Sequence, residues 1–311
     1  MRRREKVKKA AGVFQCALSE FRKNDPLRMS ASMAFFTVFA LPALPFILIT
    51  VIGNLLSIDS FSGEVLEEIG QVFGPQGSDL LTSLLKNIED MNSNWLHTLA
   101  GSGFLIFVAT TLFIVIQTSL NQIWRVRLKK NKRWKTMLRQ RGISIAFIVI
   151  LGLLFIIALV LDSFLAFAGD NLGRVLPQNI NIGVVNTISR LMSTGIIVLW
   201  FACTYKFLPD IRISWRPVLA GAILTGILFA IAKYLLSRFL ANSPLGTIYG
   251  ACGTIVIMIL FVYFTSFIMF FGAAFVKAYA DVYGYPVHPK IYAERFRVEQ
   301  DDDVEEGDSK V

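Results

Sequence analysis

The sequence predicts an all-α, polytopic membrane protein with six transmembrane helices and with its N- and C-termini in the cytoplasm. Hydrophobic residues make up 54% of the 311 residues and charged residues only 17%, a composition more apolar than that of an ordinary soluble domain. Apolar stretches recur along the chain, each close to the roughly 20 residues that a bilayer-spanning helix needs. Positive charges gather in a few short connections between these stretches, where they indicate topology.

Residues 1–29 are predicted to form a basic, amphipathic N-terminal segment on the cytoplasmic side. Apolar residues between Val13 and Arg22 repeat at helical spacing, which predicts a helix lying on the membrane surface. The sequence Asn24-Asp25-Pro26 ends this helix and leads into the first span.

The first predicted span runs from Ser30 to Gly53 and contains two prolines. Pro42 and Pro45 each remove a backbone donor and clash with the preceding turn, so we expect a broken helix. In lipid, the freed carbonyl groups need partners in neighbouring helices or in a water-lined cavity. The break is therefore either a functional element or a proline kink that the bundle tolerates.

A six-helix transmembrane domain is predicted over 30–280, with an external helical cap at 54–95. The cap region holds seven acidic residues and one base, and its apolar residues fit short amphipathic helices. The five spans after it are expected at 97–123, 142–168, 184–208, 217–241 and 249–280. Residues 281–311 are expected to form a cytoplasmic tail that is acidic and disordered from about 299.

Charge in the connecting loops orients the spans. Arg125–Arg141 holds nine Lys or Arg and no acid, and the connection 209–216 adds Arg212 and Arg216. The positive-inside rule places both connections and both termini in the cytoplasm, and it places the acidic cap outside.

Four short motifs occur in order at Ser30–Pro42, Leu120–Arg127, Tyr205–Asp210 and Tyr249–Gly253. Their order and spacing resemble the YihY/BrkB family of bacterial inner-membrane proteins, over about 20–280. The resemblance implies a multi-pass protein of the bacterial inner membrane and no settled activity, since members carry an older ribonuclease label or a serum-resistance label. The family often has Gly-Ala-Glu-Leu-Asn in the last span, whereas this chain has Gly272–Val276, with Ala274 in place of the Glu.

Ionisable residues inside predicted spans are costly and are candidates for function. Counted from the predicted span ends, all four of them lie in the outer half of the membrane: Asp162, Arg190, Lys233 and Arg238. In one interpretation Asp162 pairs with one base and the others reach the lipid headgroups. In the other, the bases form a pocket for an anionic headgroup that enters from the outer leaflet.

Three further sets of residues have predicted structural roles. Gln117 and Asn121 lie one helical turn apart and are expected to bond other helices, including the carbonyls freed by Pro42 and Pro45. Small residues at helical spacing in the fifth span predict helix packing: Ala222, Gly226 and Ala230. Tryptophans at predicted cytoplasmic boundaries are expected to be interface anchors: Trp124, Trp134 and Trp215.

The sequence offers no catalytic residue, metal ligand set or cofactor site. His97 and His288 are the only histidines, and no cytoplasmic segment combines the carboxylates or histidines that nuclease chemistry needs. The first functional hypothesis is transport or transfer of an anionic lipid or other amphiphile, with membrane lipids as partners and no nucleic acid. The alternative is a non-catalytic scaffold that docks an envelope partner through 54–95, and a ribonuclease ranks last.

Overall fold

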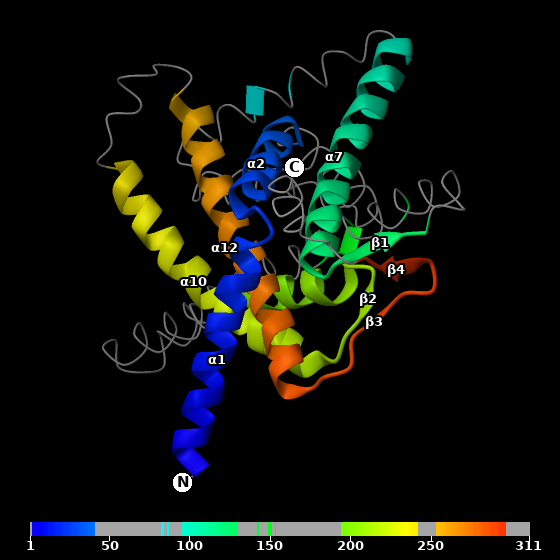
Figure 1. Ribbon diagram of the computed structural model, residues 1–311. Coiled ribbons are helices and arrows are strands. Elements are labelled where there is room, and N and C mark those ends of the chain that lie inside the picture. The colour runs from blue at the N-terminus through cyan, green and yellow to red at the C-terminus, as the bar shows by residue number, and fades with distance from the viewer. Residues whose placement is uncertain are drawn as a thin grey trace, which may run out of the picture.

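The computed structural model describes residues 2–40, 95–129, 194–241 and 253–296, with Thr82, Ser83, Lys86, Gly142, Val149, Ile150 and Leu153. This part of the chain is mostly helical (Figure 1). Its helices are α1 (Arg2–Arg22), α2 (Pro26–Ala40), α7 (Trp95–Ile123), α10 (Trp215–Ala241), α12 (Gly253–Tyr283) and the helix Thr194–Phe207. The stretches Trp215–Leu236 and Ile255–Tyr283 are long and apolar enough to cross a membrane.

The predicted spans 97–123 and 217–241 are helical, in α7 and α10, and the described part of the span 249–280 is helical in α12, which continues to Tyr283. Thr194–Phe207 lies inside the predicted span 184–208. The predictions for Pro42, Pro45 and the tail beyond 296 lie outside the described residues. So do the cap at 54–95 and the span 142–168, apart from a few helical residues in each.

The predicted break between α1 and α2 is confirmed. The Asn24 side-chain amide donates to the Glu20 carbonyl at 2.6 Å, which satisfies an acceptor at the end of α1. Asp25 has a φ of 50°, and its carbonyl accepts the Met29 amide at 3.1 Å. Pro26 then opens α2 at a position where a missing N–H costs nothing.

The apolar stripe of α1 packs on protein. Val13, Ala17 and Phe21 are 2%, 0% and 3% exposed, and the Phe21 ring meets the Phe267 ring edge-on at 4.8 Å. The expectation that this stripe lies on the lipid surface is therefore wrong, because α12 covers it. The helix also begins earlier than expected, at Arg2.

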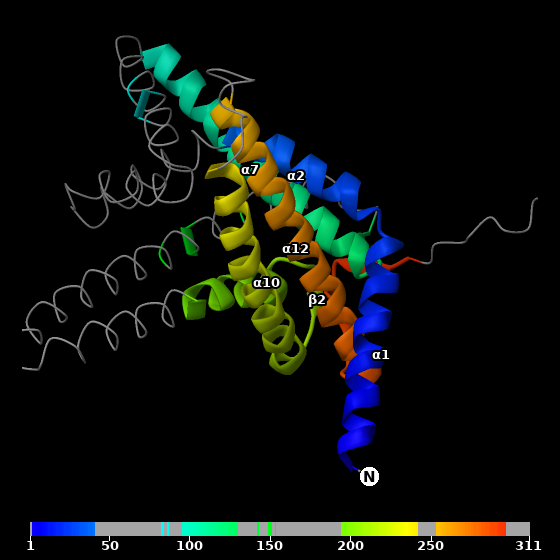
Figure 2. The same ribbon diagram turned by 90° about the vertical axis from the view of Figure 1, so that its left-hand side faces the viewer.

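α12 is the central helix of the described structure. It packs against α1, α2, α7 and α10, and Figure 2 shows it running between α10 on one side and α1 with α2 on the other. Its buried face is rich in small and aromatic residues, including Phe270, Ala273 and Ala274, each at most 1% exposed. Small residues let neighbouring helix backbones approach closely.

Glycine sets the contact between α10 and α12. The Tyr205 hydroxyl donates to the Met269 carbonyl at 2.8 Å and lies 2.9 Å from Thr225 Oγ1. A Cβ atom at Gly272 would lie 1.9 Å from Thr225 Oγ1 and 2.3 Å from the Tyr205 hydroxyl oxygen. Only a residue without a side chain fits there.

The predicted packing stripe of the fifth span is confirmed in part. Ala222 and Gly226 are buried, and a Cβ atom at Gly226 would lie 2.6 Å from Val198 of the helix Thr194–Phe207. Ala230 is exposed, so the close-packed part of the stripe ends before it.

Two short antiparallel sheets, which the sequence did not predict, join segments that are distant in the sequence. β1 (Val126–Leu128) pairs with β4 (Ala293–Arg295), with Val126 opposite Arg295. β2 (Ile211–Arg212) pairs with β3 (His288–Pro289). Gly284 turns the chain out of α12 at a φ of 70°, with the Tyr285 amide donating to the Ala280 carbonyl at 2.8 Å, as in a Schellman motif.

Replacing Gly272 by alanine is expected to destabilise the protein by about 1–3 kcal/mol, because the added methyl group overlaps the Thr225 and Tyr205 hydroxyl oxygens. Thermal unfolding of the purified protein measures this loss. Gly103→Ala in α7 is the matched control, because no atom lies within 4 Å of its added Cβ. Equal melting temperatures for the two variants would contradict the close contact.

Candidate functional site

The structure places few of the ionisable site residues that the sequence singled out. Asp162 and Arg190 lie outside the described residues, and only the helical backbone of Arg238 is described. Lys233 is exposed on α10, beside the exposed side chains of Ile231 and Tyr234. The cationic pocket of the outer half of the membrane therefore stays a prediction.

Gln117 and Asn121 meet at a buried carboxylate. Gln117 Nε2 donates to Asp210 Oδ1 at 3.2 Å, and Asn121 Nδ2 donates to Asp210 Oδ2 at 2.8 Å. Asn121 Oδ1 in turn accepts the Asp210 amide at 2.8 Å. The Asp210 residue is 1% exposed. Asp210 lies in the connection between the helix Thr194–Phe207 and β2, so these side chains bond a connecting segment, whereas bonds to other helices were predicted.

The segment after α12 completes the shell around the same carboxylate. The Tyr292 hydroxyl donates to Asp210 Oδ1 at 3.0 Å, and Lys290 Nζ lies 3.9 Å from that oxygen. The Lys290 amide donates to the Asp210 carbonyl at 2.9 Å. We call Gln117, Asn121, Asp210, Lys290 and Tyr292 the Asp210 network. Since donors surround the carboxylate, it is suited to holding segments together rather than to accepting a substrate proton.

A second polar cluster lies where α1, α12 and the end of α7 meet. Glu20 Oε1 lies 3.3 Å from Arg125 Nη2, and Lys277 Nζ bonds Glu20 Oε2. The Glu20 and Lys277 side chains are 16% and 12% exposed, whereas Arg125 is 42% exposed. The Arg125 backbone has a φ of 53°, a conformation that Gly or Asn adopts more readily.

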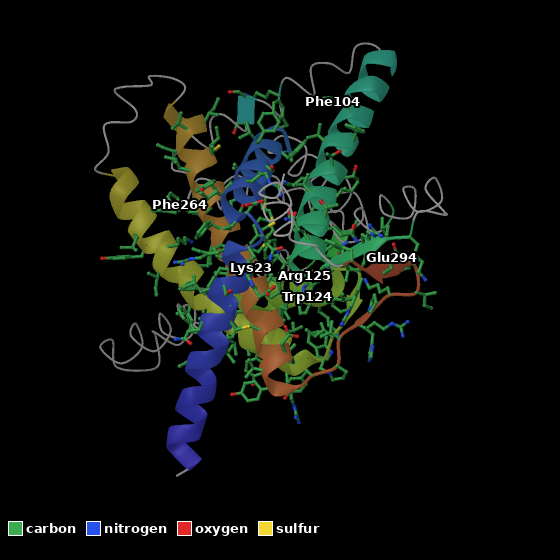
Figure 3. The ribbon with its side chains drawn as sticks, viewed as in Figure 1. Lys23, Phe104, Trp124, Arg125, Phe264 and Glu294 are labelled. Carbon is green, nitrogen blue, oxygen red and sulfur yellow. The ribbon has the colours of Figure 1, made fainter. Side chains whose placement is uncertain are left out.

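This cluster lines a half-open cavity of about 610 Å³, which we call the charged pocket. Its lining residues are Glu20, Trp124, Arg125, Val126, Lys277, Asp281, Val287, Arg295 and Phe296. Figure 3 shows Trp124 and Arg125 near Lys23 of the turn after α1. Burial alone raises the pKa of Glu20, but the bond and charge of Lys277 and the charges of Arg125 and Lys23 hold that pKa below 4.5.

Trp124 does not act as an interface anchor, contrary to expectation. Its side chain is 7% exposed, because it packs in the core at the end of α7. Trp215 fits the expectation better, at 46% exposed and with Lys206 Nζ 5.2 Å from its ring centroid. Trp134 lies outside the described residues.

Neither polar cluster has the composition of a metal centre. Within the described ranges, no group of three or more His, Cys, Asp or Glu side chains is placed to hold a metal ion. Ala274 is 0% exposed, so the position at which the family often has a Glu lies in the core of α12 here.

Comparison with known proteins agrees with the apolar helices and the motifs. The model of the virulence factor BrkB family matches residues 17–291. The chain belongs to this family. It is a membrane protein, as are its relatives by name. A UPF0761 membrane protein of Aliivibrio salmonicida is 29% identical over 80% of this chain and 77% of its own length.

A UPF0761 membrane protein of Pseudomonas aeruginosa strain LESB58 is 25% identical over 79% of this chain, which spans 57% of the length of that relative. No solved structure matches this BrkB-family chain.

Asp210→Ala is expected to destabilise the BrkB-family protein by about 3–5 kcal/mol, because it leaves the Lys290 charge and two buried amide side chains without their shared acceptor. Denaturant unfolding measures the change. Asp25→Asn, in an exposed turn, is the control and should stay within about 0.5 kcal/mol of wild type. Comparable effects of both substitutions would rule out a central role for the Asp210 network.

The stability that Glu20 contributes is expected to depend on pH. Because folding lowers the pKa of Glu20, this contribution is fully present above the ordinary glutamate pKa of 4.5 and is lost as the pH falls through the lower folded value. The stability difference between wild type and Glu20→Gln should therefore shrink below pH 4.5. Glu294→Gln, which alters an exposed pair with Arg127, controls for general acid effects. A difference that is constant with pH would contradict the assignment.

Proposed function

We propose that this protein is a six-span protein of the bacterial inner membrane that transports or transfers an anionic lipid or another amphiphile. The proposal combines its membership of a membrane-protein family, its membrane-length apolar helices and the placement of its positive charges. Each of these features bears on a different part of the proposal.

The arrangement of the connections supports an even number of crossings. The segments around β1, β2 and β4, together with the turn after α1, lie close together beside the C-terminal end of α7 (Figure 1). In the predicted topology, two spans separate each of these segments from the next, so each pair of spans returns the chain to the same side. The positive-inside rule assigns that side to the cytoplasm.

The observation that carries the transport proposal is the position of Lys233. It lies on α10 about 27 Å from Trp215 along the helix axis, close to the roughly 30 Å thickness of the hydrocarbon layer. Its side chain is exposed, and so are the neighbouring side chains of Ile231, Tyr234 and Leu235. This face offers one positive charge to an anionic headgroup and apolar surface to the chains of an amphiphile.

A scaffold that docks an envelope partner through 54–95 is the second candidate. The tight core of the described helices favours it, since Phe201, Tyr205 and Phe270 are each at most 2% exposed and Gly272 fits against Thr225. A rigid bundle suits a protein that holds another in place. The two candidates differ in whether lipid moves.

Proteoliposomes that contain the purified protein test the transport proposal. The rate at which a fluorescent anionic phospholipid moves between leaflets is expected to fall at least about tenfold in the Arg190→Gln/Lys233→Gln double variant, because a headgroup loses charge-assisted contacts. Arg212→Gln, an exposed base at the other end of α10, is the control and should keep the wild-type rate. Wild-type protein that moves no lipid would favour the scaffold.

A further inference from the structure

The charged pocket carries an excess of positive charge. Three cationic residues line the cavity, namely Arg125, Lys277 and Arg295, and Lys23 adds a positive charge near Glu20 outside the lining. Two carboxylates, Glu20 and Asp281, oppose them. The net positive charge of these side chains favours binding of an anion in the cavity.

The two arginines keep donor capacity after their observed contacts. Among the described residues, Arg125 contacts Glu20 through Nη2, and Arg295 donates through Nη2 to the Val287 carbonyl at 2.6 Å. A guanidinium group has five N–H donors in a planar fork that matches the oxygens of a phosphate. Both residues line the same cavity, which favours their sharing one phosphate.

The size of the pocket points to more than a single ion. Its volume of about 610 Å³ lies within the roughly 300–1,000 Å³ of typical small-molecule sites. Trp124, Val126, Val287 and Phe296 supply apolar wall beside the charges. A phosphate that carries an organic group fits this mixture of surfaces.

The backbone at Arg125 is a further indication. Its φ of 53° would suit Gly or Asn, yet the position holds a long cationic side chain that lines the pocket. Unusual backbone conformations of this kind occur preferentially at binding and catalytic sites.

The pocket also lies at the depth expected of lipid headgroups. Lys277 and Asp281 belong to the last two turns of the apolar stretch Ile255–Tyr283. The pocket is therefore at one boundary of this membrane-length helix and at the end of the molecule remote from Lys233.

We propose that the charged pocket binds a phosphate ester, held by Arg125, Arg295 and Lys277, at the membrane boundary next to β1 and β4. The phosphate belongs either to a phospholipid headgroup or to a soluble compound, and the two sources share the same contacts. This inference goes beyond the transport proposal, because it concerns the opposite end of the molecule and requires no movement of lipid.

Binding to the purified full-length protein, measured by native mass spectrometry and by calorimetric titration, tests the inference. The probes are dioctanoyl phosphatidylglycerol, inorganic phosphate and dioctanoylglycerol, which lacks the phosphate. Arg125→Gln is expected to weaken binding of the phosphate-bearing probes about tenfold, the loss expected for one charged hydrogen-bonding group. Arg127→Gln is the matched control, because Arg127 is two residues away and pairs with Glu294 on the exposed sheet.

Binding of phosphatidylglycerol without binding of inorganic phosphate identifies a lipid ligand, and equal binding of both identifies phosphate itself. Loss of binding in Arg125→Gly, which relaxes the backbone while removing the guanidinium group, shows that the side chain is responsible. Equal affinities in Arg125→Gln and Arg127→Gln, equally tight binding of dioctanoylglycerol, or no binding of any probe would overturn the proposal. Lipid movement in the Arg190/Lys233 variant is a separate measurement, so failure of one proposal leaves the other standing.

Discussion

The buried carboxylate of Asp210 is the constraint on which the described structure depends. A charge that is 1% exposed is costly unless donors surround it, and in the described part of the chain these donors come from separate segments. The donors come from α7 through Gln117 and Asn121, and from the segment after α12 through Lys290 and Tyr292. Hydrogen bonding to this one carboxylate therefore brings together the end of α7, the segment that holds Asp210 and the segment after α12. The pairing of β1 with β4 and of β2 with β3 follows from that proximity.

The described helices of the BrkB-family protein are tightly packed near β1 and β2, whereas some charged side chains are exposed elsewhere. The Asp210 network and the close contact at Gly272 hold this packed region together. The charged pocket lies beside this packed region, where α1 covers α12. Lys233 is exposed on α10, about 27 Å from Trp215 along the helix axis. Arg125 beside this packed region and Lys233 farther along α10 are the more exposed charges. This division suits either the movement or the anchoring of an amphiphile.

The sequence predicted the helices well and their contacts poorly. α7, α10 and α12 follow from long apolar runs, and the break before Pro26 follows from its turn residues. The polar character of Gln117 and Asn121 predicted a bond across helices, but their partner lies 89 residues from Asn121, a distance over which local patterns carry no information. β1 and β4 are too short to show a period-two pattern. The predictions for Trp124 and for the apolar stripe that includes Val13 were wrong, because an apolar surface can pack against a neighbouring helix as well as against lipid.

A double-mutant cycle between Asn121→Ala and Tyr292→Phe tests most directly whether Asp210 joins these segments. Both side chains donate to the same carboxylate, from segments far apart in the sequence. If the carboxylate is their shared partner, their effects on the free energy of unfolding should couple by more than about 0.5 kcal/mol. Effects that add to within about 0.3 kcal/mol would contradict the account, because they would show that the two segments are stabilised independently.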